Sequence, residues 1–484
     1  MGLTVAKFGG SSVGSSEAMR RSAEIVSSDP SIRLVVLSAL FGTTDALEKL
    51  AEWAPEGQEK ELTLLIESIE KQHWSLADEL SCREEIQEKF EELFRELTDL
   101  VKGMSLLKEC SKRTRDQLLS IGERLSTLLF AALLNSMGVQ AQWVDVRKVM
   151  VTNTTHGQAE PLLTEVSSRC STEIWPLLES DKIVVTQGFI GATEERTTTT
   201  LGRGGSDFSA AILAEGLAAD ELQIWTDVPG ILSSDPRIIS SVRSIPEISF
   251  AEAAELATFG AKVLHPATLW PAVRSDIPIR VASSKEPEKS GTWIYQKVKE
   301  QPNVRAIAVR RKQVLLTVVS LKMYQARGFL ARLFQTLADH EISVDLVTTS
   351  EVSVALTVNN PDSLSNALMH DLRAFAELHI DRDLALIAII GNRIASTPGL
   401  ASQAFSVADP YNVRMTCQGA SEHNLCFLVE EQHVEEILHK LHERFLEGAD
   451  DACGTSGLWE DGESDRNMRS ESECRNHSTS RPSR

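Results

Sequence analysis

The stretch VAKFGGSSVGSS near the start of the chain combines a lysine with small residues in a way that suits phosphate binding. Lys7 ends an apolar run, and Gly9 and Gly10 follow it almost directly. Glycines let backbone N–H groups turn toward one point, and a nearby lysine adds a positive charge. The spacing is not that of a Walker A loop. The pattern therefore predicts a phosphate cradle, with a lysine in an ordinary turn as the alternative.

A second glycine-rich stretch, LGRGGSDF, opens an apolar helical pattern. The N-terminus of such a helix offers free N–H donors and the positive end of the helix dipole to an anion. Arg203 adds a guanidinium fork that fits a carboxylate or a phosphate. Ser206 and Asp207 stand where plain helix caps are also common. Together with Lys7, this stretch suggests a site that brings two anionic groups together.

Four other stretches are less specific. WTDVPGI and SDPR are typical of turns, and FGAKVLHP places Lys262 near a helix end, with His265 as a packed or capping residue. Glu123 lies in SIGERLSTLLF, where a very apolar run begins. A carboxylate there faces either solvent or a cation, and the ammonium group of a substrate is one candidate.

These residues need elements to position them, and through the first 300 residues short apolar runs alternate with helical patterns. This alternation predicts an α/β domain, with a mainly parallel sheet between two helical layers. The runs LVVLS and IVVTQGF are apolar on both faces, as buried parallel strands are. The longest helical region is expected over residues 57–137. Strands are predicted at Leu3–Phe8, Arg33–Ser38, Gln140–Val144, Lys182–Ile190, Leu222–Val228 and Pro278–Ala282.

From about residue 312 the pattern changes to strand–helix–strand–strand and occurs twice. One 71-residue offset relates Gly328 to Gly399, Phe334 to Phe405 and Ser350 to Ser421. We interpret residues 312–447 as two copies of a small α+β module, each too small to bury its sheet face alone. They are expected to pack on each other or on a second chain.

Composition limits the class of protein. The chain has 484 residues, 42% of them hydrophobic, and a net charge of −20, which indicates a soluble protein of two to four domains and disfavours nucleic acid or an anionic membrane as the main partner. No signal peptide and no uncharged apolar run of about 18 residues is found. Seven scattered cysteines are expected to be thiols in a reducing cytoplasm. The Ser- and Gly-rich residues 448–484 are expected to be disordered.

These motifs, in this order, resemble those of the aspartokinases. KFGGSSV, SIGERLS, TLGRGGSD, WTDVPGI, SDPR and FGAKVLHPATL carry the resemblance, which covers about residues 3–447. SLKMYQARGFL, ISVDLVTTSEVSVALTV and GASEHNLCFLV are similar to the paired ACT modules of the lysine-inhibited bacterial type. The resemblance implies a three-layer αβα amino-acid-kinase fold over residues 1–300 and two interleaved, ferredoxin-like ACT modules over 312–447.

The activity implied is ATP-dependent phosphorylation of the side-chain carboxylate of L-aspartate to 4-phospho-L-aspartate, the first step toward lysine, threonine and methionine. L-Lysine is implied as inhibitor, and a homodimer or homotetramer is implied through the ACT modules. A carboxylate is already a nucleophile, so the reaction needs two anions held together and their charge neutralised. Mg²⁺ is expected on the ATP phosphates and on water, with no protein ligand.

The resemblance also assigns residues. Those expected at the nucleotide are Lys7, Phe8, Gly9, Gly10, Thr226, Asp227, Leu232, Arg237 and Lys262. Those expected around aspartate are Ser38, Thr44, Glu123, Arg203, Ser206 and Asp207, and the catalytic group is Lys7, Arg203 and Asp207. Arg203 would grip a substrate carboxylate, while Glu123 and Asp207 would meet the ammonium. Those expected at the lysine effector are Met323, Phe329, Leu330, Ser343, Val344, Asp345, Ser350 and Glu351.

Four positions depart from the common family pattern. Ser11 replaces a threonine, whereas Leu232, Phe208 and Gln418 replace tyrosines. Leu232 removes an aromatic contact to the nucleotide, and Gln418 leaves the response to effectors open. Two other functions stay open: a kinase of glutamate or N-acetylglutamate, and a catalytically weak amino-acid sensor. The paired modules argue against the first, and the intact Lys7 motif argues against the second.

Overall fold

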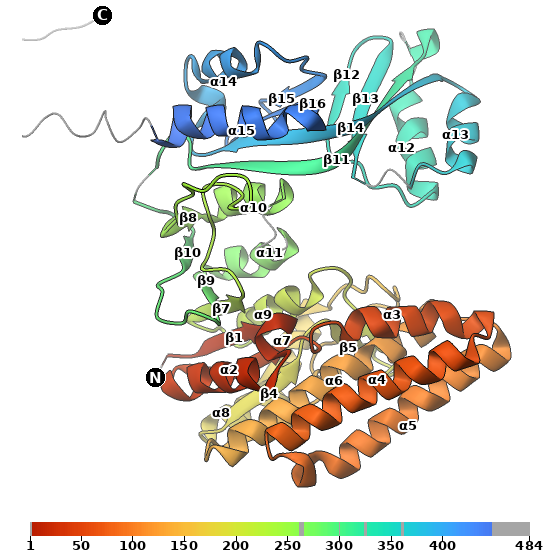
Figure 1. The fold of residues 1–484 in the computed structure, drawn as a ribbon, viewed down its shortest axis with the longest axis vertical. Helices are drawn as coiled ribbons and strands as arrows, with labels where there is room; N and C mark the ends of the chain where they lie inside the picture. The colour runs from red at the N-terminus through yellow and green to blue at the C-terminus, as the bar shows by residue number, and fades with distance from the viewer. Residues whose placement is uncertain (1, 261–265, 300, 324–326, 360–362, 448–484) are drawn as a thin grey trace, which may run out of the picture.

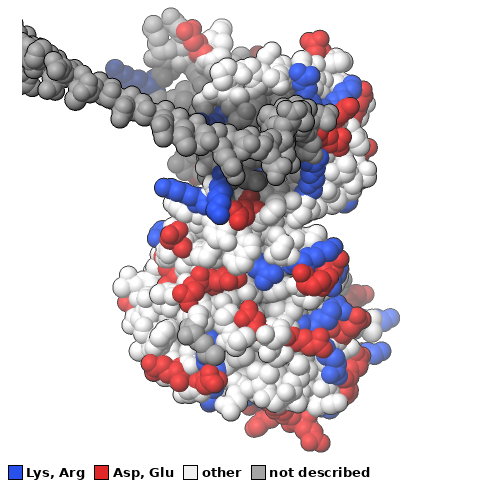
Figure 2. All heavy atoms as spheres, turned by 90° about the vertical axis from the view of Figure 1, so that its left-hand side faces the viewer, with Lys and Arg blue, Asp and Glu red and all other residues white. Residues whose placement is uncertain are grey.

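The computed structural model describes residues 2–260, 266–299, 301–323, 327–359 and 363–447. The predicted disordered tail, 448–484, lies outside these residues. Figure 1 shows a larger α/β part below and a smaller part above, which is built on a second sheet. Acidic and basic side chains are interspersed over the face drawn in Figure 2.

The larger part is organised around one eight-stranded sheet, in the order β3-β4-β2-β1-β7-β9-β10-β8. All its neighbouring strands are parallel except β9 and β10. The six strands predicted from the sequence are confirmed and lie side by side. They are β1 (Thr4–Phe8), β2 (Ile32–Leu37), β3 (Ala141–Val144), β4 (Ile183–Gln187), β7 (Glu221–Thr226) and β9 (Ile279–Ser283); β8 (Glu247–Ser249) and β10 (Thr292–Tyr295) were not predicted.

Alternate residues of these strands enter two separate cores, as the two-faced apolar pattern requires. Val5, Val184 and Ile224 belong to one core, and their neighbours Ala6 and Val185 belong to the other. The first core is covered by α7 (Leu163–Arg169), α8 (Trp175–Glu179), α9 (Gly205–Gly216), α10 (Phe250–Thr258) and α11 (Pro266–Ser275). The second is covered by α2 (Ser16–Ser28) and α3 (Thr43–Trp53), together with the helical insert. The three-layer αβα prediction is confirmed.

The helical region predicted over residues 57–137 consists of three helices. They are α4 (Glu59–Glu79), α5 (Arg83–Leu107) and α6 (Lys112–Ser136). The Ser111 side chain caps α6 by accepting a hydrogen bond from Thr114 N. By length and composition α6 could cross a membrane, but 89% of its most apolar 18-residue window is buried inside the protein. Its place between the sheet and α5 makes it a core helix.

The smaller part is a six-stranded antiparallel sheet, in the order β12-β13-β11-β14-β16-β15. Its centre is a pair of 14-residue strands, β11 (Ala306–Val319) and β14 (Glu377–Ile390). The others are β12 (Val347–Thr349), β13 (Ser353–Val358), β15 (Met415–Gln418) and β16 (Asn424–Glu430). Four helices accompany them: α12 (Phe329–Asp339), α13 (Asn366–Arg373), α14 (Leu400–Ala408) and α15 (Val434–His442).

The two modules predicted from the internal repeat share this sheet. Gly328 and Gly399 precede equivalent helices with φ angles of 84° and 79°, in the left-handed region that favours glycine. The half of β11 near Val318 packs with α12 and α13, whereas the half near Ile307 packs with α14 and α15. Each module therefore uses part of the same two long strands, which is why the modules are interleaved.

The two parts meet where α10 lies against the second sheet (Figure 1). Phe250, Leu256 and Phe259 share a core with residues of β11, β14 and β16. A buried ion pair joins Arg305 Nε to Glu252 Oε1 at 2.8 Å. Ile307 N donates to the carbonyl of Ser233 at 2.8 Å, so the backbone just before the SDPR motif is bonded to β11.

Candidate active site

A cavity of about 1140 Å³ opens beyond the carboxyl end of β1, where ligands bind in open α/β sheets. Its wall contains every residue predicted to surround aspartate, although these residues come from four separate stretches of the chain. They are Ser38, Thr44, Glu123, Arg203, Ser206 and Asp207, and Lys7 lies beside them.

Lys7 is held at the wall of this cavity by a short ion pair. Its Nζ lies 2.5 Å from Asp207 Oδ1, and its side chain is 11% exposed. A β-carbon at Gly10 would lie 2.9 Å from the carbonyl oxygen of Ala39, so only glycine fits there. The loop after Lys7 is therefore packed tightly against the loop after β2, with its short helix α1 (Gly10–Val13) directly behind.

The stretch around Arg203 forms the start of α9, as the sequence indicates. Gly204 has a φ angle of 73°, and α9 begins at Gly205, so Ser206 and Asp207 lie in its first turn. A β-carbon at Gly188 would lie 2.7 Å from the Cα of Ser206, which fixes this turn against the end of β4. Arg203 is exposed at the cavity and makes no ion pair with any described residue, so its guanidinium is available to a carboxylate.

Glu123 is a buried carboxyl group whose hydrogen bonding is incomplete. It is 3% exposed, and its Oε1 accepts a hydrogen bond from Ala39 N at 3.3 Å. Its Oε2 has no partner among the described residues. Burial raises the pKa of Glu123 to about 8. A cationic ligand in the cavity would satisfy the free oxygen and stabilise the carboxylate.

Several residues predicted at the nucleotide gather at the same edge of the sheet. Gly9 N donates to the carbonyl of Trp225 at 3.3 Å, which places Thr226 and Asp227 beside the glycine loop. The Phe8 ring is buried and stacked on Trp225 with centroids 6.0 Å apart, so only its backbone is available to a ligand.

The other nucleotide predictions are not brought to the cavity wall. Arg237 pairs with Asp235 at 2.6 Å and its side chain is 77% exposed, and Asp235 raises the pKa of the guanidinium. Leu232 lies in the same segment, where it bridges Ser244. Lys262 and His265 lie outside the described residues.

The sequence reasoning missed several residues of the cavity wall. On α6 these include Lys112, Arg115 and Asp116, and the last of these lies seven residues before Glu123 on the same helix face. His156 comes from the loop between β3 and α7. The signal that could have found Asp116 is its spacing from Glu123; no local pattern marks His156.

The residues predicted for a lysine effector lie around the edge strand β12. Asp345 precedes β12 and pairs with Arg310 at 2.8 Å, and burial raises its pKa. Ser350 and Glu351 follow β12 and are exposed, as is Leu330 at the start of α12. Ser343 is exposed too, but it belongs to the wall of the larger cavity, beside Glu341. Met323, Phe329 and Val344 pack partly against the core of the first module. Asp345 and Glu351 thus stand at opposite ends of one strand.

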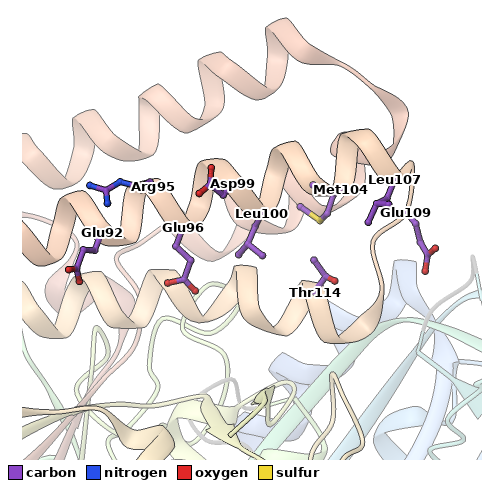
Figure 3. Close-up of a pocket in the computed structure, with 10 residues that line it drawn as sticks. Glu92, Arg95, Glu96, Asp99, Leu100, Met104, Leu107, Glu109 and Thr114 are labelled. Carbon is purple, nitrogen blue, oxygen red and sulfur yellow. The ribbon is translucent and has the colours of Figure 1, made fainter.

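A smaller cavity of about 550 Å³ lies along α5 and α6 (Figure 3). It contains none of the predicted residues. Its Glu96 is already bonded to Arg124 and Gln117. Within the part of the chain that the structure describes, no group of three or more His, Cys, Asp or Glu side chains is placed to hold a metal ion.

Comparisons with known proteins agree with this arrangement. A profile of the amino acid kinase family matches residues 2–283, and one of the ACT domain matches residues 316–367 and 387–445. Lysine-sensitive aspartokinase 3 of Escherichia coli K12 is 48% identical over 92% of this chain and 99% of its own length. Chloroplastic aspartokinase 2 of Arabidopsis thaliana is 36% identical over 92% of this chain and 84% of its own length.

Solved structures extend the comparison to the whole fold. Escherichia coli aspartokinase III, in complex with aspartate and ADP in the R-state, superposes with a TM-score of 0.83 over 91% of this chain and 99% of that one, at 48% identity. The same enzyme, in complex with lysine and aspartate in the T-state, gives 0.79 over 92% of this chain and 99% of that one. By sequence, motif order and architecture, this chain belongs to the aspartokinases of the amino acid kinase family.

Proposed function

We propose that the cavity beside Lys7 transfers a phosphoryl group from ATP to the side-chain carboxylate of L-aspartate, which gives 4-phospho-L-aspartate and ADP. One observation carries the proposal: six residues expected around aspartate, from four stretches of the chain, line this single cavity together with Lys7. The relative with 48% identity is an aspartokinase whose structure contains aspartate and ADP.

The cavity separates the two charges of the substrate. The exposed guanidinium of Arg203 offers a fork to a carboxylate. The free Oε2 of Glu123 and the carboxylate of Asp207 offer acceptors to the ammonium. This arrangement leaves the side-chain carboxylate of aspartate to face Lys7. Because that carboxylate is itself the nucleophile, the mechanism requires no general base.

The phosphoryl group needs compensation for its negative charge. Lys7, the glycine loop and the N-terminal turn of α9 converge on one point, and such fixed donors stabilise charge that develops in the transition state. Mg²⁺ would be held by the ATP phosphates and by water, and when bound it would neutralise phosphate charge. Thr226 and Asp227, beside the glycine loop, are placed to contact the rest of the nucleotide.

Inhibition by lysine is the regulatory part of the proposal, because the relative with 48% identity is named lysine-sensitive. Arg310 of β11 pairs with Asp345 and also donates to the carbonyl of Thr258, at the end of α10. A lysine bound at Asp345 would compete with Arg310 for that carboxylate. Arg310 therefore connects the proposed effector region to the end of α10 through one side chain.

A complete effector site requires a second chain in this proposal. The distance along β12 from Asp345 to Thr349 alone is roughly 13 Å at about 3.3 Å per residue. One lysine cannot span from Asp345 to Glu351 within one chain. If two chains paired their β12 edges about a two-fold axis, Asp345 of one chain would lie near Glu351 of the other. The proposal therefore includes a homodimer or homotetramer formed through the ACT modules. We place the enzyme in the cytoplasm, at the first step of lysine, threonine and methionine synthesis.

The test is ATP-dependent phosphorylation of L-aspartate, with the acyl phosphate trapped by hydroxylamine, with and without L-lysine. We expect turnover that lysine suppresses. Turnover that ignores lysine would remove the effector site from the proposal. Turnover of glutamate or N-acetylglutamate in place of aspartate would assign a different carboxylate substrate. A chain that phosphorylates none of these acids would overturn the kinase proposal itself.

A further inference from the structure

Asp116 is a buried carboxylate at the cavity wall whose hydrogen bonds all come from one loop and one neighbouring strand. Its side chain is 1% exposed. Its Oδ1 accepts from Thr200 Oγ1 at 2.6 Å, in strand β6 (Thr198–Thr200), which pairs with β5 (Ile190–Ala192). Its Oδ2 accepts from Gly157 N at 3.1 Å and lies 2.7 Å from His156 Nδ1. Both carboxylate oxygens are thus already occupied by the protein.

His156 lies in this cavity with one ring edge still free. Its Nδ1 is engaged by Asp116, while its Nε2 bonds to no described residue. The side chain is 18% exposed and shares the cavity wall with Glu123 and Arg203. A β-carbon at Gly202 would lie 3.3 Å from the carbonyl oxygen of Gly157, so the loop after His156 touches the turn that carries Arg203.

We propose that His156 is a specificity-determining residue of the aspartate site, and this rests on the function proposed above. Asp116 fixes the ring through Nδ1–H, and the free Nε2–H donates to the α-carboxylate of aspartate beside Arg203. The side-chain carboxylate is then left to the phosphoryl group at Lys7. Asp116 is the positioning residue of this pair and touches no substrate.

The protonation state of the ring decides whether it can donate. Only the imidazolium carries a proton on both nitrogens; the neutral ring that keeps Nδ1–H on Asp116 presents a lone pair at Nε2. The other charged groups at the wall are largely paired. Arg115 bonds to Glu48, Lys112 lies 3.7 Å from Glu341, and Lys7 lies 2.5 Å from Asp207. Arg203 stays available, and Glu123 binds its ligand only as a carboxylate.

A His156 variant isolates the contribution of this ring to aspartate binding, because Glu123 and Arg203 are common to both enzymes. The ratio of KM values between variant and wild type is therefore the informative quantity.

The variants are His156→Asn, whose amide N–H replaces Nδ1–H toward Asp116 but leaves nothing at Nε2, and His156→Phe, which removes both. We expect His156→Asn to raise KM for aspartate about tenfold and KM for ATP to stay constant. His433→Asn is the control, because His433 also lies near a carboxylate, 3.7 Å from Glu430, but in the second module and away from the cavity. Its KM ratio should be one.

A second readout uses L-aspartic acid α-amide, which keeps the side-chain carboxylate and lacks the α-carboxylate. The wild type should prefer aspartate over this amide more strongly than His156→Asn does. An unchanged KM and an unchanged preference in His156→Asn, with a loss only in His156→Phe, would show a loop anchor and overturn the inference. A wild type that phosphorylates no aspartate would overturn the proposed function and this inference together, whereas an active wild type with a ratio of one overturns only the inference.

Discussion

The aspartate cavity and the region around β12 differ in how much of a binding site one chain supplies. In the cavity, Lys7, Asp116 and Glu123 are all buried and are fixed by backbone or side-chain partners. Around β12, the strand itself and the neighbouring Ser350 and Glu351 are exposed. One chain therefore encloses the residues of the cavity, whereas it leaves those around β12 open on one side.

The difference reflects what each site has to do. Phosphoryl transfer needs charges held in place before the substrate arrives, which burial and fixed hydrogen bonds provide. A regulatory site needs only a difference in affinity between two states, and a contact between chains can supply it. The cavity should therefore work within one chain, whereas the region around β12 should need a second chain.

Replacement of Lys7 should have the largest effect. Lys7→Ala and Lys7→Met remove a fixed cation that faces the phosphoryl group, and kcat should fall by about 10² to 10³. Lys440→Ala is the matched control, since Lys440 pairs with Glu436 at 2.7 Å on the far module. Steady-state kinetics with hydroxylamine trapping measures both. A Lys7 variant within threefold of wild type would mean that the cavity does not use this lysine.

Glu123→Gln should chiefly affect aspartate binding. The carboxyl group, with a pKa of about 8, is mostly neutral in the free chain at pH 7, and an ammonium ligand favours its ionised form. Aspartate binding should therefore release a proton below about pH 8 and tighten as pH rises toward 8. Glu123→Gln should abolish this release and raise KM for aspartate by about 10- to 100-fold. Calorimetry in two buffers of different ionisation enthalpy counts the protons.

Burial of Glu123 should also make the stability of the ligand-free chain depend on pH. Its folded-state pKa is above the ordinary value near 4.5, so the unfolded state loses its proton first and stability of the ligand-free chain falls as pH rises from about 4.5 to 8. The stability of the Glu123→Gln variant should not show this decrease. Equal pH slopes for the two proteins in thermal unfolding would contradict the burial assigned to Glu123.

Glu351→Gln should weaken lysine inhibition by about tenfold, because a rim carboxylate would be lost from the effector site. Glu377→Gln, at another exposed glutamate of the same module, is the control. Inhibition of the wild type should also weaken on dilution if two chains form the site. Inhibition that is independent of protein concentration and of Glu351 would place the effector elsewhere.

His73 offers a test within the helical insert. It is fully buried against Phe90 and Phe94, and burial lowers its pKa to about 4. Unfolding lets it take up a proton, so acidification from about pH 6.5 to 4 should cost up to about 3 kcal/mol of stability. His73→Phe should reduce this loss of stability on acidification. His379→Phe is the control, because His379 is exposed, and it should leave the loss unchanged. Thermal unfolding across this pH range provides the measurement.

The smallest effect is expected at the contact between the modules and the cavity. Lys112 and Glu341 form an exposed pair at 3.7 Å, and such pairs contribute about 0.5 kcal/mol or less. Lys112→Ala and Glu341→Gln should change aspartate turnover by less than twofold. A tenfold loss of turnover in either variant would show that the cavity depends on its contact with the first module. The cavity would then not be independent of the regulatory part.

The sequence predicts the parts of this molecule that depend on local pattern. The six adjacent strands are predicted by runs that are apolar on both faces. The binding roles of Lys7 and Arg203 are predicted because each cation stands beside a glycine-rich loop. It does not predict contacts made across the chain. Asp116 and His156 lie 40 residues apart, and nothing near His156 marks it. Strand β8 has only three residues, too few to show an alternating apolar pattern. Arg237 pairs with Asp235, two residues away, and so does not reach the cavity.

Helix α6 places Lys112, Asp116, Leu119 and Glu123 on the cavity wall at intervals of four, three and four residues. Each residue added to a helix turns everything beyond it by about 100°. A single-codon insertion or deletion between Lys112 and Glu123 would therefore rotate one end of this set away from the substrate, even if every side chain were preserved. The number of residues in this stretch of α6 is therefore fixed by the cavity that it lines.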